Sequence, residues 1–402
     1  MHIWKHFSTI TRHRHKVIVH CFMAGIFWQG LRHDLSKYSP AEFIPGAKNY
    51  LGDKSPNEKE RERYGFSRAW LHHQGRNKHH FEYWVDYNPK LNRKEPVEMP
   101  TRYLIEMFCD RVAASKIYYG DVTKKESLSS VFENIDGKEV YVIHCAGVVY
   151  IKSKYNPIVY DVNVNGTKNI VDKVLEIDAK LIYVSSVHSI TEKPNNEKIT
   201  EITNFDSGKV VGLYAKTKAE AAKYVIDAIK NKNLNACIIH PSGIIGPNDY
   251  GNSHLTQLIK EVATGKLFAC VKGGYNFVDV RDVADGIISA CDKNNRGECY
   301  ILSNKYITIK ELTDFVCDLE EKKRIKIVLP LWLAKLVAPI CELYYNIKKQ
   351  TPLFTKYSLY TLSSNSNFSN EKAKKELEYK NRDMKDTIKD TIKWLKRMNY
   401  IK

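Results

Sequence analysis

The hydrophobic pattern of this chain changes near residue 120. Beyond that point, short runs of apolar and β-branched residues alternate with helical segments, and the clearest runs are 140–143, 181–184 and 236–239. Continuous apolar runs separated by helices are typical of a parallel sheet that is buried on both faces. Before residue 120, strand patterns are few and helical patterns are many. The pattern therefore predicts an α/β fold that follows an all-helical region.

These two regions define the predicted domains. A length of 402 residues fits two or three domains. We predict a helical, histidine-rich domain at 1–119 and an α/β domain at 120–402. Neither an internal repeat nor a low-complexity linker separates them, so the join is abrupt.

Composition excludes some classes of function. The net charge is +17, but the lysines are scattered or lie in short runs that are typical of solvated helix faces. Because no aromatic and basic recognition module accompanies them, we expect no nucleic-acid partner. The most apolar segment, 327–345, contains two prolines and two charged residues, which predicts no transmembrane segment. Nine cysteines without a C-x-x-C pair fit a reducing cytoplasm.

Three polar side chains indicate chemistry in the α/β region. Tyr214 and Lys218 lie four residues apart and therefore share one helix face, and Ser186 follows the run at 181–184. A phenol with a pKa near ~10 exchanges protons poorly at neutral pH unless a fixed cation lowers that pKa. Lys218 supplies such a cation, and Ser186 can bind a substrate oxygen. The set suits proton transfer at a carbinol while hydride passes to a nicotinamide.

Further segments occur in a fixed order around this set. Small residues end the first strand at 144–147, and an Asn-Gly segment at 163–167 precedes a helix. A His-Pro-Ser-Gly segment follows the third strand at 240–243. At 277–285, Asp282 is placed to cap the helix that begins there. Order and spacing together are more specific than any one segment.

This series resembles the extended short-chain dehydrogenase/reductase family, which includes NAD-dependent epimerases/dehydratases and 3β-hydroxysteroid dehydrogenase-like enzymes. The resemblance runs from about residue 120 to the C-terminus and implies a Rossmann-type sheet with a C-terminal substrate-binding region. It implies Ser186, Tyr214 and Lys218 as catalytic residues, NAD or NADP as cofactor, and a sugar-nucleotide or steroid-like small molecule as substrate. It also implies a homodimer. The cofactor-binding residues that it implies are Asp121, Val122, Ala146, Gly147, Tyr214, Lys218, His240 and Pro241.

One departure from the family concerns the phosphate-binding loop. The family begins with a strand, a T-G-x-x-G-x-x-G turn and a helix whose N-terminus binds the pyrophosphate. No segment of this chain has that spacing of glycines. Helical sequence stands where the first two βα units belong, so the Rossmann-type sheet is truncated. We therefore expect a weakened cofactor site and an unpaired apolar edge along the strand at 140–144.

The helical region carries its own candidate site. Ten of the fourteen histidines precede residue 120, and two of the segments that hold them are 30–40 and 71–80. Imidazole and carboxylate ligands on helices can hold divalent metals that activate water. The pattern resembles that of HD phosphohydrolases and, more closely, a small family of unknown function. The predicted ligands of one or two metal ions are His15, His33, Asp34, His73, His79 and Asp110.

Three functional interpretations follow. The first is an NAD(P)-dependent oxidoreductase or epimerase fused to a helical domain, which we favour because this resemblance covers more of the chain. The second is a metal-dependent phosphohydrolase that resides in residues 1–119. The third is a non-catalytic fusion product, which the abrupt join near residue 120 favours.

Overall fold

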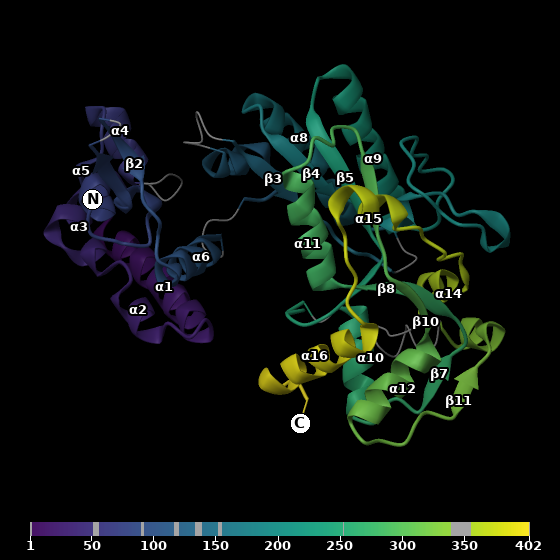
Figure 1. Ribbon diagram of the computed structural model, residues 1–402. Coiled ribbons are helices and arrows are strands. Elements are labelled where there is room, and N and C mark those ends of the chain that lie inside the picture. Colours follow the sequence, from purple (N-terminus) through teal and green to yellow (C-terminus); the bar gives the residue numbers. More distant parts are fainter. Residues whose placement is uncertain are drawn as a thin grey trace. The chain divides into compact units, whose positions relative to one another are not determined.

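The computed structural model describes residues 2–50, 56–89, 92–115, 120–132, 139–151, 155–251, 253–338 and 355–401. It divides into two compact units, Met1–Gly120 and Asp121–Lys402, and each unit is described here by itself (Figure 1).

Unit 1 is built around its longest helix, α1 (Ile3–Met23). This helix buries His6, Ile10, His13, Val17 and Cys21, whose spacings of three and four residues place them on one face. Val17 and Cys21, toward the C-terminal end of that face, pack against the last helix of the unit. Cys109 and Ala113 of that helix complete a small apolar core. The other helices of unit 1 are α2 (Phe27–Arg32), η1 (Leu35–Tyr38), α3 (Pro40–Asn49), α4 (Pro56–Tyr64), α5 (Arg68–Gln74), η2 (Phe81–Tyr83) and α6 (Thr101–Ser115).

Unit 1 is not all helical, and the prediction was wrong on this point. Strands β1 (Val85–Asn88) and β2 (Arg93–Pro96) form an antiparallel hairpin in which Val85 pairs with Pro96. β1 alternates Val85 and Tyr87 with polar residues, which is a strand pattern too short to stand out in the sequence.

Unit 2 contains a four-stranded parallel sheet with the strand order β3-β4-β5-β9. The first three strands coincide with the predicted apolar runs, and this prediction is confirmed. In the register of this sheet, Ile143 lies opposite Ile182, and Tyr183 lies opposite Ile238. The four strands are β3 (Tyr141–His144), β4 (Lys180–Val184), β5 (Asn235–Pro241) and β9 (Cys299–Leu302).

Both faces of this sheet are buried, as predicted. On one face, Leu181 and Tyr183 join the core beneath α8 (Gly166–Glu176) and α9 (Leu213–Asn231). On the other face, Ile182 packs with residues of α11 (Val280–Cys291) and α15 (Glu371–Leu377). Figure 1 shows α11 and α9 on either side of the strands. Successive side chains of a strand point to opposite faces, so one apolar run supplies both cores.

The edge strand β3 is consistent with a truncated sheet. Among the described residues its one neighbour is β4, and the Ile143 side chain is 44% exposed. An exposed apolar side chain on a strand with free backbone groups favours pairing with another chain.

The N-cap of α11 is Asp279 rather than the predicted Asp282. Asp279 accepts a hydrogen bond of 2.7 Å from the backbone N–H of Arg281, and the helix begins at Val280. Asp282 lies inside the first turn and pairs with Arg382 instead. The two aspartates lie three residues apart in the sequence. Asp279 is the last residue of β8 (Gly274–Asp279) and therefore the one at the helix start.

In the described part of the chain, the rest of unit 2 contains two smaller sheets. A second sheet has the order β10-β8-β6, and β11 pairs with β7. Within the described residues, no helix has the length and apolar character needed to cross a bilayer. The remaining elements are η3 (Lys125–Val131), α7 (Pro157–Tyr160), η4 (Asp161–Asn165), η5 (Val187–Ser189), η6 (Pro194–Asn196), β6 (Gly243–Ile245), α10 (His254–Ala263), β7 (Ala269–Val271), β8 (Gly274–Asp279), β10 (Lys305–Thr308), α12 (Ile309–Leu319), β11 (Ile327–Leu329), α14 (Lys356–Ser363) and α16 (Met384–Arg397).

Candidate functional sites

The carboxyl ends of the central strands bring the first candidate site together. Ser186 follows β4, Gly147 follows β3, and His240 lies near the end of β5. Parallel strands place these ends at one edge of the sheet, which is where α/β proteins bind ligands. Ser186 is also the N-cap of η5, and its Oγ accepts a hydrogen bond from the backbone N–H of His188.

Tyr214 and Lys218 lie in the first two turns of α9, and both side chains are buried. Lys218 Nζ donates a hydrogen bond of 2.9 Å to the carbonyl oxygen of Val184, the last residue of β4. It also lies 5.2 Å from the centre of the Tyr183 ring. Burial lowers the pKa of Lys218 to about 8, so its charge is held less firmly than that of a surface lysine.

The surroundings of Tyr214 favour its neutral form. Burial raises the pKa of the Tyr214 phenol, and the interaction with the Ser186 side chain opposes this rise. The His188 ring meets the Tyr214 ring edge-on at 6.0 Å, and burial lowers the pKa of His188 to about 4. The expectation that Lys218 lowers the pKa of Tyr214 is therefore wrong, since burial raises that pKa and only the Ser186 side chain opposes the rise.

Asn163, in the Asn-Gly segment at 163–167, lies next to this candidate site. Its side chain accepts a hydrogen bond from the backbone N–H of Val148 at 2.7 Å and donates one to Thr217 Oγ1 at 3.0 Å. It therefore ties the loop after β3 to the helix that carries Lys218. A Cβ at Gly147 would lie 3.2 Å from Lys218 Nζ and 3.3 Å from Asn163 Oδ1. Close approach of the backbone at this point favours glycine.

Four other predicted cofactor residues lie at different depths. Ala146 is exposed beside Gly147, whereas Pro241 is buried where β5 pairs with β9. Asp121 is exposed, and its carboxylate accepts hydrogen bonds from Thr123. Val122 packs against Gly166 at the start of α8. A Cβ added at residue 166 would lie 2.7 Å from Val122 Cγ2, so this contact requires glycine.

His240 belongs to the support of the site. It is fully buried, and its Nδ1 lies 3.1 Å from both the Ser186 carbonyl oxygen and Ser189 Oγ. Burial lowers its pKa to about 4, so the ring is neutral at physiological pH. The neutral imidazole fixes the backbone on which Ser186 is mounted.

A pocket with an internal volume of about 40 Å³ adjoins η5 and the start of α9. Its wall combines aromatic, apolar and charged side chains, and none of them was singled out from the sequence. The residues that line one part of it are His188, Ile190, Lys209, Ala215, Tyr275 and Phe368. Tyr275 stacks on His188 at 5.6 Å, which links the pocket to the ring that faces Tyr214.

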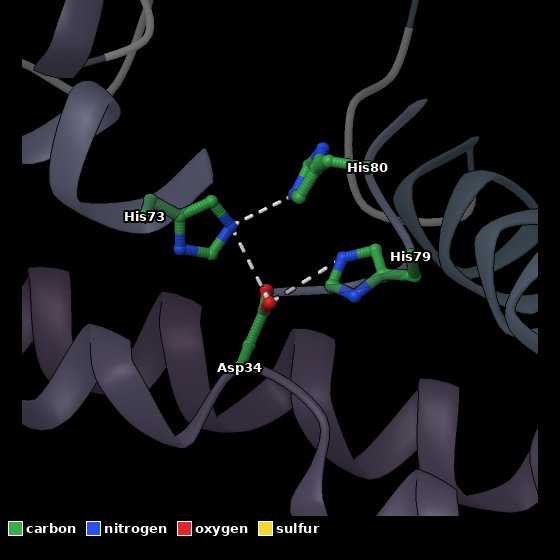
Figure 2. Close-up of side chains that lie close together, drawn as sticks. All are labelled: Asp34, His73, His79 and His80. Atoms are coloured by element: carbon green, nitrogen blue, oxygen red, sulfur yellow. Dashed lines mark hydrogen bonds and ion pairs between the residues drawn. The ribbon is translucent and has the colours of Figure 1, made fainter. Parts of the chain in front are cut away.

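The second candidate site is a buried cluster in unit 1 centred on Asp34 (Figure 2). Asp34 Oδ1 lies 3.4 Å from His73 Nε2 and 3.5 Å from His79 Nε2. Asp34 Oδ2 lies 3.3 Å from His33 Nε2. His73 Nε2 lies 2.9 Å from His80 Nε2. The four rings come from the end of α2, from α5 and from the segment after α5.

The structure corrects one predicted ligand of this cluster. His15 is exposed, because two residues along a helix turn its side chain away from the face that His13 occupies. His13 is buried, and its Nε2 lies 2.8 Å from Asp110 Oδ1. Asp110 in turn lies 3.2 Å from His33 Nε2. His13 and His80, neither of which was predicted as a ligand, also belong to this cluster.

The pKa values of His33 and Asp34 are both shifted in the direction that favours the charged form. Burial opposes charge, yet the Asp34, Asp110 and Glu106 carboxylates raise the pKa of His33 well above its ordinary value. Burial alone would raise the pKa of Asp34, but His33, Lys37 and His73 hold it well below its ordinary range. The buried His33 imidazole and Asp34 carboxylate therefore stabilise each other's charged forms.

Comparison with known proteins gives two overlapping matches. The NAD dependent epimerase/dehydratase family matches residues 86–303, more than half of the chain. A family of unknown function, DUF5662, matches residues 2–144. The epimerase match begins inside unit 1, earlier than the expected start near residue 120.

Individual proteins extend this comparison. Sterol demethylase protein B of Methylococcus capsulatus is 26% identical over 292 residues, which are 70% of this chain and 85% of that protein. The crystal structure of gox2253 has a TM-score of 0.61 and 28% identity, covering 73% of this chain and 89% of that one. The dTDP-glucose 4,6-dehydratase of Bacillus anthracis, solved with NAD, has a TM-score of 0.54 and 18% identity, covering 72% of this chain and 83% of that one.

Proposed function

Because the chain belongs to the NAD dependent epimerase/dehydratase family, we propose that unit 2 interconverts a carbinol and a carbonyl, with NAD or NADP as the hydride partner. The observation that carries this proposal is the placement of Tyr214 and Lys218 on one face of α9, beside Ser186 at the end of β4. Three polar groups of the types that this reaction needs meet at one strand edge.

Each of the three residues has a role in the proposal. Tyr214 passes the hydroxyl proton to or from the substrate oxygen, and Ser186 donates a hydrogen bond to the same oxygen. Lys218 holds a cation on α9 four residues after Tyr214, beside the place where the cofactor ribose can approach. Its bond to Val184 fixes this cation relative to β4. Asn163 and His240 act as positioning residues through Gly147, Thr217 and the Ser186 backbone.

The residues fit one half of a nicotinamide cofactor. Gly147 is exposed after β3, and its backbone lies beside Lys218, so a flat ring and its ribose can approach there. When bound, the nicotinamide accepts or donates the hydride. The pyrophosphate half is different, since no segment of the chain has the glycine spacing that anchors it. We therefore infer a weak cofactor site in which the nicotinamide end carries most of the affinity.

The substrate class is a steroid-like or sugar-nucleotide alcohol. Supporting the first is the name of the Methylococcus relative, a sterol demethylase protein. Supporting the second is the likeness in fold to a dTDP-glucose dehydratase. The pocket of about 40 Å³ beside η5 is far smaller than either substrate, so it does not choose between the two classes.

Replacement of Tyr214 by phenylalanine tests this function. The assay follows absorbance of reduced cofactor with a panel of 3β-hydroxysteroids and sugar nucleotides at millimolar NAD or NADP. We expect Tyr214→Phe to reduce any turnover by at least about 100-fold, the scale of a lost general acid or base. Tyr224→Phe on the same helix is the matched control and keeps its turnover. Equal turnover of Tyr214→Phe and the unchanged chain would remove the proton-transfer role.

A further inference from the structure

The two oxygens of Asp34 face two different groups of histidines. Oδ1 is directed to His73 and His79, and Oδ2 is directed to His33 (Figure 2 shows the first group). One group of potential ligand atoms comprises Asp34, His73, His79 and His80, and the other comprises His13, His33, Asp34 and Asp110. Within each group, the ligand atoms lie within 4.8 Å of one another. Asp34 belongs to both groups.

Several separations suit ligands of a common ion better than hydrogen bonds. Metal–nitrogen bonds of about 2.0–2.1 Å in a tetrahedral site place ligand atoms roughly 3.3 Å apart. The separations from Asp34 to His33, His73 and His79 are 3.3, 3.4 and 3.5 Å. Normal N–H···O hydrogen bonds are shorter, with a mode near about 2.9 Å. These three separations are therefore those of ligands around a common ion, whereas His13–Asp110 (2.8 Å) and His73–His80 (2.9 Å) have hydrogen-bond lengths.

The outward ring nitrogens of three histidines are held by glutamates. His33 Nδ1 lies 2.9 Å from Glu106 Oε1, and His79 Nδ1 lies 3.4 Å from the same oxygen. His73 Nδ1 lies 2.8 Å from Glu42 Oε2. In metal sites, a ligating histidine usually donates its second N–H to a carboxylate, which fixes the ring and leaves the other nitrogen free for the ion. Two buried glutamates thus set the tautomer in which Nε2 points inward.

The inward atoms are buried and lack good hydrogen bonds. Among the described residues, Asp34 Oδ1 and the Nε2 atoms of His33 and His79 make no hydrogen bond of acceptable geometry, whereas Asp34 Oδ2 has a close ion pair of 2.6 Å with Lys37 Nζ. Asp34, His33 and His79 are 1%, 1% and 2% exposed. Buried polar atoms without partners are costly, so native proteins seldom retain them without a ligand or ion. The backbone of Asp34 is also left-handed (φ 51°), a conformation that costs energy and is concentrated at functional sites.

We propose that unit 1 binds two divalent transition-metal ions that share the Asp34 carboxylate. One ion takes Asp34 with His13, His33 and Asp110, and the other takes Asp34 with His73, His79 and His80. Imidazole and carboxylate ligands without thiolate suit Zn²⁺, Mn²⁺, Fe²⁺, Co²⁺ or Ni²⁺. Glu42 and Glu106 are positioning residues. All of these ligands belong to unit 1, so the proposal does not depend on the function proposed for unit 2.

Lys37 gives the proposal a distinctive consequence. Its Nζ lies 2.6 Å from Asp34 Oδ2, the oxygen that faces His33, and competes with a metal ion for that oxygen. Replacing Lys37 with methionine therefore tightens binding at the ion held by His13, His33 and Asp110. A structural ion-pair cluster without a metal would instead be weakened by loss of the same cation.

The test loads the full chain with Mn²⁺, Co²⁺ or Zn²⁺ after chelation and counts bound metal by elemental analysis and calorimetry. We expect two equivalents in the unchanged chain. His13→Asn or His80→Asn reduces this to one, and Asp34→Asn reduces it to none. His15→Asn is the matched control on α1 and keeps two equivalents. Co²⁺ visible absorption in His13→Asn and His80→Asn then identifies each ion separately.

The outcomes decide the proposal in either direction. Two equivalents that fall to none in Asp34→Asn, with a tighter first ion in Lys37→Met, support it. No bound metal in the unchanged chain, one equivalent that neither His13→Asn nor His80→Asn alters, or two equivalents retained in Asp34→Asn would overturn it. Circular dichroism of each variant shows that a loss of metal is not a loss of fold, and Glu106→Gln supplies a milder variant that weakens binding without removing a ligand.

Discussion

Lys218 donates a hydrogen bond of 2.9 Å to the carbonyl oxygen of Val184, and this bond joins α9 to the end of β4. The lysine is buried and its pKa is lowered to about 8 by burial. The same side chain thus ties α9, at a point four residues after Tyr214, to the parallel sheet. A buried carbonyl at a strand end needs a partner, and Lys218 supplies it.

Replacement of Lys218 by methionine removes that partner while keeping much of the side-chain volume. We expect a loss of about 1–3 kcal/mol in the free energy of unfolding, the range for a buried acceptor left without its donor. Urea denaturation, followed by hydrogen exchange of peptides from unit 2, measures the loss. Lys216→Met, which changes an exposed lysine of the same helix, should be neutral. An equal loss of unfolding free energy in the two variants would show that the hydrogen bond to Val184 does not stabilise the fold.

Acid should destabilise unit 2 through its buried histidines. Burial, with a smaller contribution from Lys218, lowers the pKa of His144 to about 3. An unfolded histidine takes up its proton near pH ~6.5, whereas the folded one stays neutral until about pH 3. The unfolded state therefore binds more protons as the pH falls below ~6.5, and stability present above that pH is lost on the way down.

His144→Gln tests the pH dependence directly. Glutamine can still hydrogen-bond to Thr167 Oγ1, which lies 3.0 Å from His144 Nε2, but it cannot titrate. Between pH 6 and 4 the free energy of unfolding should fall less steeply in the variant, by about 1.4 kcal/mol per pH unit. Hydrogen exchange of peptides from β3 and β4 provides the measurement. An unchanged slope would rule out His144 as a source of acid sensitivity.

The exposed edge strand should promote self-association. Ile143 is 44% exposed on β3, whose one neighbour among the described residues is β4. A lysine at an edge position discourages strand pairing between chains. We expect Ile143→Lys to shift the chain toward monomer in light scattering coupled to gel filtration. Val149→Lys, at a 71% exposed position outside the strands, is the control. Association that both variants reduce alike would point to general charge rather than the edge.

The fold of unit 2 could be predicted because its signals are local. Continuous apolar runs such as 181–184 gave the strands, and burial of alternate residues on both faces follows directly from that pattern. The β1–β2 hairpin was missed because four-residue strands carry little periodicity. Asp279 and Asp282 are both residues that cap helices well, so the sequence did not distinguish them. The ion pair between Asp282 and Arg382 joins segments about 100 residues apart and could not be predicted from local sequence.

The candidate sites were predicted less completely, since side chains from distant segments complete them. Spacing alone gave Tyr214 and Lys218, but nothing local marked Asn163 as the link between Val148 and Thr217. In unit 1, the choice between His13 and His15 depended on which face of α1 meets α6. The predicted homodimer, the cytoplasmic location and the phosphohydrolase activity of residues 1–119 stay predictions.

The affinity for cofactor fragments tests the central claim most directly, namely that unit 2 holds the nicotinamide half of a cofactor and lacks the anchor for its pyrophosphate. Calorimetric titration of the full chain compares NADH with reduced nicotinamide mononucleotide. We expect both to bind with dissociation constants near or above about 1 mM, within about tenfold of each other, and both to weaken in Lys218→Met. Micromolar binding of NADH with no binding of the mononucleotide would contradict the account.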